Sequence, residues 1–109
     1  MTALEGIESL NSTDFETQIK NGVTLVDFGA SWCAPCRMQR PAIEQLAVQH
    51  FGKAMFAEVD VDENRQTAMK FGIMSIPTII IFKDGKEIQR FVGLQPANAL
   101  SLAIEKALQ

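Results

Sequence analysis

The chain has 109 residues, of which 47% are apolar and 21% are charged, and it carries a net charge of −3 at pH 7. This length and apolar content predict a single domain, residues 1–109, with its own hydrophobic core. The acidic balance excludes the basic surface by which proteins bind nucleic acids or anionic membranes.

The N-terminal segment is acidic where a signal peptide would be basic and then apolar, and no stretch is long enough to span a membrane. We therefore expect a cytoplasmic protein with no membrane partner. Residues 4–9 form a weak predicted strand. Thr13 to Glu16 match a capping box, and Phe15 and Ile19 lie one helical turn apart, so a helix is predicted before Asn21-Gly22.

Residues 23–30, VTLVDFGA, are a mostly apolar run that predicts a central strand covered on both faces. A helix is predicted to begin at Cys33 or Ala34, and Pro41 inside it is expected to kink the axis. Its apolar residues recur at roughly helical spacing: Met38, Ile43, Leu46 and Ala47.

Residues 53–64 predict another strand that ends in acidic turn residues, and residues 65–72 predict a short helix closed by Gly72. Residues 78–93 read as a β-hairpin around Asp84-Gly85, a pair suited to a tight turn. The last helix is predicted to start at Pro96. Its expected buried stripe is Leu100, Ala103, Ile104, Ala107 and Leu108.

These elements predict an α/β protein with three layers, in which a mixed sheet of about five strands is flanked by four helices. Helices between the early strands indicate parallel crossovers, and the hairpin adds antiparallel strands. Cys33 follows a central strand and begins a helix, the place where open α/β sheets usually hold their sites.

The only two cysteines, Cys33 and Cys36, are separated by two residues, so they could form a structural disulfide, part of a metal site, or a reactive pair. A closed zinc site needs four ligands, usually cysteine or histidine. Besides the two cysteines, the chain has one histidine, His50. We therefore predict no metal site and expect His50 to be solvated near a helix end. In a reducing cytoplasm, a close cysteine pair is more often catalytic or metal-binding than a permanent structural disulfide.

A reactive pair agrees with the predicted position of Cys33 at a helix N-terminus, because unpaired N–H groups and the helix dipole favour a thiolate there. Cys33 is the candidate nucleophile. Cys36, one turn further into the helix, is expected to be more buried and to resolve a mixed disulfide.

The sequence resembles the thioredoxin family. The resemblance rests on WCAPC at residues 32–36, with VDF before it, SIPT around Pro77, the FKDG hairpin, and FVG near residue 92. It runs in order over nearly the whole chain and implies the thioredoxin fold. It also implies a thiol-disulfide oxidoreductase that needs no bound cofactor beyond the Cys33-Cys36 disulfide or dithiol.

By this resemblance, the protein reduces disulfides in other proteins and is itself reduced by thioredoxin reductase with electrons from NADPH. We expect it to act as a monomer. Cys33 attacks the target disulfide and Cys36 resolves the complex. Pro77 is the expected cis-proline, and the backbone of Ile76 is expected to bind an extended substrate peptide.

Asp27 is the one charged residue of its predicted strand, and a carboxylate buried there is costly unless it is protonated or paired. We expect a raised pKa for Asp27 and proton exchange with Cys36. The family places a buried acid at this position. Several relatives carry a lysine near this acid, where this chain has Glu58. The negative charge of Glu58 would raise the pKa of Asp27 further.

An apolar surface for substrates is expected around the pair, with Trp32 next to the nucleophile. The other residues assigned to it are Ala34, Pro35, Ile76, Pro77, Val92 and Gly93. The methionines Met38, Met55, Met69 and Met74 are expected to fill the core instead.

Two small residues depart from the usual family pattern: Ala34 stands where many members have glycine, and Gly29 where many have an aromatic residue. Gly29 is expected to leave a looser floor beneath Trp32. The alternative functions are a specialised oxidase, isomerase or dedicated reductase on the same fold, and a non-catalytic subunit that docks peptides.

Overall fold

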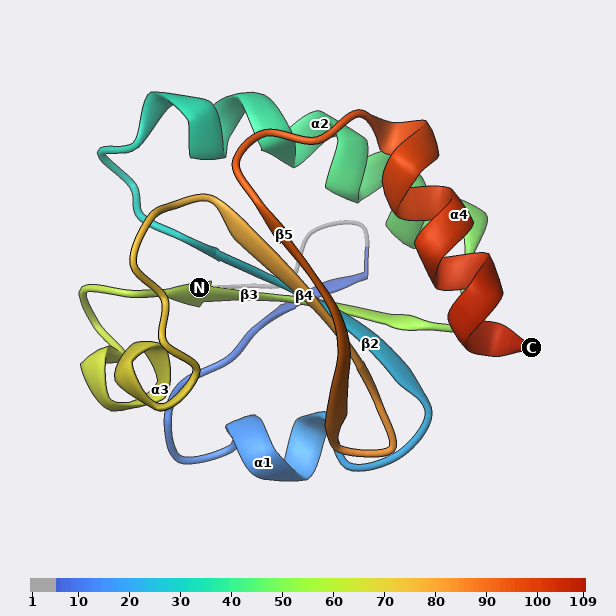
Figure 1. Ribbon diagram of the computed structural model, residues 1–109, viewed down its shortest axis with the longest axis horizontal. Coiled ribbons are helices and arrows are strands. Elements are labelled where there is room, and N and C mark those ends of the chain that lie inside the picture. The colour runs from blue at the N-terminus through green and yellow to red at the C-terminus, as the bar shows by residue number, and fades with distance from the viewer. Residues whose placement is uncertain (1–5) are drawn as a thin grey trace.

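The computed structural model describes residues 6–109, and within that range five strands form one sheet with helices on both faces (Figure 1). The first two residues of the predicted strand over residues 4–9 lie outside the described range. The strands are β1 (Ile7–Ser9), β2 (Val23–Gly29), β3 (Met55–Asp60), β4 (Thr78–Lys83) and β5 (Lys86–Val92). The helices are α1 (Phe15–Gln18), α2 (Ala34–Gln49), α3 (Arg65–Lys70) and α4 (Ala97–Leu108).

The sheet is mixed, as predicted, with the strand order β1-β3-β2-β4-β5. β3 runs parallel to β1 and β2, whereas β4 runs antiparallel to both β2 and β5. The central position of β2 is confirmed, because it has a neighbour on each edge and its residues 23–28 are all buried. Its carboxyl end leads directly into the segment that holds both cysteines.

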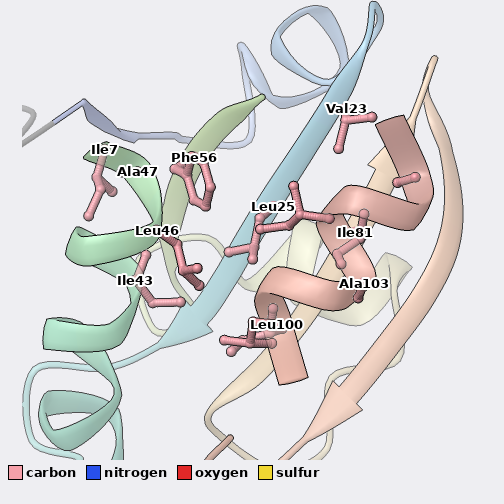
Figure 2. Packing of buried hydrophobic residues seen from close by; sticks show 13 residues of the cluster. Ile7, Val23, Leu25, Ile43, Leu46, Ala47, Phe56, Ile81, Leu100 and Ala103 are labelled. Carbon is pink, nitrogen blue, oxygen red and sulfur yellow. The ribbon is translucent and has the colours of Figure 1, made fainter. Parts of the chain in front are cut away.

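Two apolar clusters fill the space on either side of the sheet, because successive residues of a strand point to opposite faces. Val23 and Leu25 face the layer of α2 and α4 (Figure 2). Val26 and Phe28 belong to the cluster on the other side. There Phe15 of α1 packs against Phe28 with ring centroids 6.1 Å apart. The three predicted layers are therefore confirmed (Figure 1).

The hairpin of β4 and β5 has the predicted turn at Asp84-Gly85. Both residues have positive φ, +51° and +86°, which is the conformation that a two-residue turn between twisted strands requires. Asp84 also ties the hairpin to the start of β2, because its Oδ1 accepts a hydrogen bond from the N–H of Gly22 at 2.8 Å.

The predicted capping box at Thr13 to Glu16 is wrong. The N-cap of α1 is Asp14, and it makes no capping hydrogen bond with its side chain. Instead, Oδ1 of Asn11 accepts hydrogen bonds from the N–H groups of Thr13 and Asp14. An asparagine side chain can satisfy local backbone donors in this way, and it replaces the predicted cap. The predicted helix before Asn21-Gly22 is confirmed, and both Phe15 and Ile19 are buried.

The methionines do not fill the core, contrary to the prediction. Met38, Met55, Met69 and Met74 are all exposed. In α2 the buried stripe consists of Gln39, Ile43, Leu46 and Ala47, so Gln39 takes the place expected for Met38. Gln39 can be buried because its amide is fully engaged with the backbone of Gln95, by bonds of 2.7 and 3.0 Å.

The two long helices otherwise follow the sequence pattern. α2 continues through Pro41, and α4 buries Leu100, Ala103, Ile104 and Ala107. Leu108, the last residue of α4, is exposed rather than buried. Pro96 is the N-cap of α4 and not its first helical residue. Among residues 6–109, no helix is both long enough and apolar enough to cross a membrane.

Candidate active site

Cys33 and Cys36 are joined by a disulfide at the start of α2, with their Cα atoms 5.3 Å apart. Cys33 is the N-cap of the helix, and its Sγ accepts a hydrogen bond from the N–H of Cys36 at 3.2 Å. The N–H groups of a first helical turn have no partner within the helix, so sulfur at the cap satisfies one of them. A negative charge that develops on Cys33 Sγ is stabilised by this donor and by the helix dipole.

Ala34 and Pro35 form the exposed first turn of α2 between the two cysteines. Proline is favoured in this turn because its fixed φ suits a helix and its missing N–H leaves no unsatisfied donor. The backbone before the helix turns sharply, because the N–H of Cys33 bonds to the C=O of Ala30 at 3.2 Å. Strand β2, this turn and the proline together fix the position of the pair beyond the carboxyl end of β2.

Strand register brings the candidate residues that are distant in the sequence to the same end of the sheet, at the carboxyl end of β2. Phe28 pairs with Thr78 and Thr78 pairs with Val92, so Pro77 and Gly93 lie beside the carboxyl end of β2. The Ile76-Pro77 peptide bond is cis, as the resemblance implied, and Pro77 is buried. The N–H of Gly93 donates to the C=O of Pro77 at 2.8 Å.

An exposed apolar surface borders the disulfide. Trp32 is 67% exposed and Val92 is 59% exposed, while Ile76 is partly buried. Trp32 and Ile76 line one small hollow of about 190 Å³, together with Val61, Ile73, Met74 and Ser75. Met74, at 95% exposed, was missed as a surface residue because a methionine in a single sequence is ambiguous between core and contact surface.

The indole ring of Trp32 is anchored by a second residue that sequence reasoning missed. Its Nε1 donates a hydrogen bond to Oδ2 of Asp62 at 2.7 Å. Asp62 lies in the turn after β3, where its own N–H bonds to Oδ1 of Asp60 at 2.8 Å. The acidic stretch DVDEN predicted a turn, but nothing in it indicated a partner 30 residues away.

Ile76 offers free backbone groups for strand addition. It lies just before β4, and within residues 6–109 neither its N–H nor its C=O has a hydrogen-bond partner. Backbone groups of this kind are normally paired with protein or water. An extended peptide laid along Ile76 would satisfy both groups.

Asp27 is buried in β2, as expected, at 8% exposed. Its pKa is raised from 3.8 to about 7, mainly by burial and further by the charge of Glu58, while the charge of Arg40 opposes the increase. Within the described range, Oδ1 of Asp27 is buried without a hydrogen-bond partner. The carboxyl group is therefore poised to gain or lose a proton near neutral pH.

Glu58 pairs with Asp27 across the parallel strands β2 and β3. Nη1 of Arg40, from α2, donates to Oε2 of Glu58 at 2.7 Å, and its Nε lies 3.4 Å from Oε2 of Glu44. Burial raises the pKa of Glu58, and the Arg40 charge opposes this. The expected influence of Glu58 on Asp27 is thus confirmed, but Arg40 supplies a balancing cation that the sequence analysis missed.

The two cysteines differ in exposure in the opposite sense to the prediction. Cys33 is only 4% exposed, whereas Cys36 is partly exposed. The reason is Gly29, because a Cβ atom added there would lie 3.1 Å from Cys36 Sγ. Gly29 therefore leaves space beside Cys36. The expected space beneath Trp32 is not found there.

That space is part of a pocket of about 550 Å³ that shares no lining residue with the hollow beside Trp32. The pocket is lined by Cys36, Asp27 and Gly29, and by Arg40 and Glu58. Cys33 and Trp32 do not line it. Cys36 thus borders a pocket with ionisable side chains, whereas Cys33 is buried at the cap of α2.

His50 is buried at the carboxyl end of α2, at 6% exposed, so the expectation of a solvated histidine is wrong. Its Nδ1 lies 3.1 Å from the C=O of Leu46, one of the last carbonyls of the helix, and this contact allows the ring to be buried. Within residues 6–109, no three side chains of histidine, cysteine, aspartate or glutamate converge to hold a metal ion.

Comparison with known proteins agrees with this geometry. The family model described as Thioredoxin matches residues 6–106. The chain belongs to the thioredoxin family. A thioredoxin of Staphylococcus saprophyticus is 49% identical over 94% of this chain and 98% of its own length, and one of Staphylococcus aureus is 46% identical over the same shares.

A solved structure shows the same fold. The N21Q mutant thioredoxin from Halobacterium salinarum superimposes with a TM-score of 0.88 at 35% identity, covering all of this chain and 96% of its own. The predicted thioredoxin fold is confirmed. With its paired cysteines two residues apart, this member of the thioredoxin family is a thiol-disulfide oxidoreductase.

Proposed function

We propose that this protein reduces disulfides in other proteins by dithiol-disulfide exchange, with Cys33 as the attacking thiol and Cys36 as the resolving thiol. The observation that carries the proposal is the position of Cys33 Sγ at the cap of α2, where it accepts the N–H of Cys36 at 3.2 Å. The same donor and the helix dipole lower the cost of a thiolate on Cys33.

The apolar surface beside the pair supports binding of an extended protein segment. The segment would add to the free backbone of Ile76 and contact Trp32 and Val92, with Ala34, Pro35, Pro77 and Gly93 around it. Gly93 has a φ of +91° and no side chain, so a substrate backbone can approach closely.

In the reaction, Cys33 thiolate attacks one sulfur of the target disulfide and forms a mixed disulfide. Cys36 then attacks Cys33 Sγ, releases the target thiol and restores the Cys33-Cys36 disulfide. Cys36 must lose its proton for this step. Asp27 lines the same pocket as Cys36 and has a pKa of about 7, so we assign it as the group that takes this proton.

Electrons return to the disulfide from NADPH through thioredoxin reductase, and the protein acts in the cytoplasm as a monomer of one domain. The relatives named above are thioredoxins, which supports thioredoxin reductase as the electron donor. A specialised oxidase or isomerase would instead form or reshuffle disulfides, and a docking subunit would need neither cysteine.

The test is reduction of a disulfide-bonded model protein with NADPH and a thioredoxin reductase, followed as loss of NADPH absorbance. We expect turnover by the wild type and none by Cys33→Ser. Turnover that survives in Cys33→Ser would contradict the proposed chemistry. A wild type that oxidises dithiols but is not reduced by the reductase would favour the specialised oxidase.

A further inference from the structure

Cys36 lines a pocket together with Gly29, which stands where many members of the family have an aromatic residue. Gly29 contributes no side chain, and the first atom of one would lie 3.1 Å from Cys36 Sγ and 3.3 Å from Cys36 Cβ. The pocket of about 550 Å³ beside Gly29 reaches Cys36 and does not reach Cys33. A small molecule can therefore contact Cys36 without using the surface around Trp32.

The pocket also holds a polar group with an unused hydrogen-bonding atom. Asp27 is more than nine-tenths buried, lines the pocket, and its Oδ1 has no partner within residues 6–109. A buried carboxyl oxygen without a partner is costly, and a ligand that donates a hydrogen bond to it removes that cost.

The charges around the pocket select among possible ligands. Its lining has four carboxyl groups, from Asp27, Glu58, Asp60 and Glu63, against two cations, Arg37 and Arg40. The charge of Arg40 is balanced by Glu58, 2.7 Å away, and the charge of Arg37 is outnumbered by those of Asp60 and Glu63. The remaining field is negative, so it repels anions and favours neutral or cationic ligands.

We propose that this pocket admits a small neutral or cationic thiol, such as an aminothiol, which reduces the disulfide by attacking Cys36 Sγ. Which sulfur of a disulfide is attacked depends on access, and the pocket provides access to Cys36 alone. This route goes beyond the proposed reaction with proteins, which uses Cys33 and the Trp32 surface. It gives the protein a second source of electrons that needs no protein partner.

The incoming thiol gives its proton to the Asp27 carboxylate, and its sulfur forms a bond to Cys36 Sγ. The Cys33-Cys36 bond breaks, and its electron pair leaves on Cys33 as a thiolate, which the Cys36 N–H stabilises. A second thiol gives its proton to the Cys33 thiolate and attacks the sulfur of the bound thiol. The small disulfide is released, and Cys36 leaves as a thiolate that takes the proton from Asp27. Two small thiols are oxidised, and the protein disulfide is reduced to a dithiol.

The mixed disulfide on Cys36 can be isolated in the Cys33→Ser variant, because that variant lacks the thiol that would displace it. The reduced variant is mixed with cystamine, hydroxyethyl disulfide or dithiodipropionate, which transfer a cationic, a neutral or an anionic thiol to Cys36. Mass spectrometry follows the adduct, and each rate is divided by the rate in urea-unfolded protein. We expect cystamine and hydroxyethyl disulfide to react at least about fivefold faster than dithiodipropionate.

Gly29→Ala in the same background closes the space beside Cys36 and should slow all three reagents at least about fivefold. The matched control is Gly29→Ala in the Cys36→Ser variant, where the adduct forms on Cys33 and its rate should change less than about twofold. Equal adduct rates on Cys36 with and without Gly29→Ala would overturn the proposal.

The charge series needs no change at Gly29, so it remains decisive even if Gly29→Ala does not fold. A preference for dithiodipropionate, or equal rates for all three reagents, would also overturn the proposal. The outcome is independent of the proposed function, because reduction of a model protein through Cys33 is measured separately with NADPH and the reductase. Failure of one measurement leaves the other intact.

Discussion

Arg40 and Glu58 form an ion pair, with Nη1 of Arg40 2.7 Å from Oε2 of Glu58, next to the buried carboxyl group of Asp27. Glu58 raises the pKa of Asp27 and Arg40 lowers it. Where several relatives place one lysine near the buried acid, this chain places an acid and an arginine. The two charges offset each other, so desolvation remains the largest influence on Asp27.

Asp27 should make the stability of the oxidised protein depend on pH. Its pKa is about 7 when folded and near 3.8 when unfolded, so the folded state holds the proton more tightly. The stability that this proton contributes is fully present below about pH 4 and is lost as the pH rises through about 7. At pH 8, Asp27→Asn should therefore raise the free energy of unfolding by up to about 4 kcal/mol.

The measurement is urea unfolding of wild type and Asp27→Asn between pH 4 and pH 8. Only the difference between the two proteins reports on Asp27, because the other carboxyl groups titrate in both. The difference should grow with pH and level off above about pH 7 to 8. A difference that does not vary with pH would contradict the assigned pKa.

Removing Arg40 should leave two carboxyl groups facing each other without a cation. Arg40→Met is expected to raise the pKa of Asp27, which a carbon-detected NMR titration of the side chain measures. It should also destabilise the protein by about 1–2 kcal/mol at pH 8, since Glu58 loses its partner in a half-buried site. Arg40→Lys keeps the charge and is the control. An unchanged pKa of Asp27 in Arg40→Met would refute the role of the ion pair.

Asp62 should act by positioning Trp32. Asp62→Ala removes the acceptor of the 2.7 Å bond from the indole Nε1. The exposed ring then loses its fixed orientation, and we expect KM for a protein disulfide to rise about threefold with little change in kcat. Asp62→Asn retains an acceptor oxygen and should behave like the wild type. A fall in kcat with no change in KM would show that Asp62 does not act through substrate binding.

Met74 should contribute to substrate binding rather than to stability. It is 95% exposed and lines the hollow beside Trp32 and Ile76. Met74→Ala is expected to lower kcat/KM for protein disulfides about twofold to fivefold, with a change in unfolding free energy below about 0.5 kcal/mol. Met55→Ala, at the start of β3 and outside the hollow, is the control for loss of an exposed methionine. Equal effects of the two variants on kcat/KM would argue against a docking role for Met74.

The fold and the redox pair were predictable because their signals are local. The apolar run at residues 23–30, the Asp84-Gly85 turn and the spacing of Leu100, Ala103 and Ile104 each report on a neighbourhood of a few residues. The position of Cys33 at a helix N-terminus follows from the same kind of signal. The resemblance to the thioredoxin family then identified the residues that lie far apart in the sequence.

The parts that were not predictable depend on contacts between distant residues. Gln39 is buried only because Gln95 meets both ends of its amide, and Asp62 is recognised only by its bond to Trp32. The exposure of Cys36 depends on Gly29, which the sequence marks as unusual without showing which neighbour it uncovers. In each case the deciding fact is a distance across the fold.

The most direct test of the proposed mechanism is to trap the covalent complex with a protein substrate. Reduced Cys36→Ser protein is mixed with a disulfide-bonded model protein, and the products are separated without reductant and mapped by mass spectrometry. The mechanism predicts a stable mixed disulfide through Cys33, because the resolving thiol is missing, and no such complex with Cys33→Ser. A protein complex formed through Cys36 in the Cys33→Ser variant, or none in either variant, would contradict it.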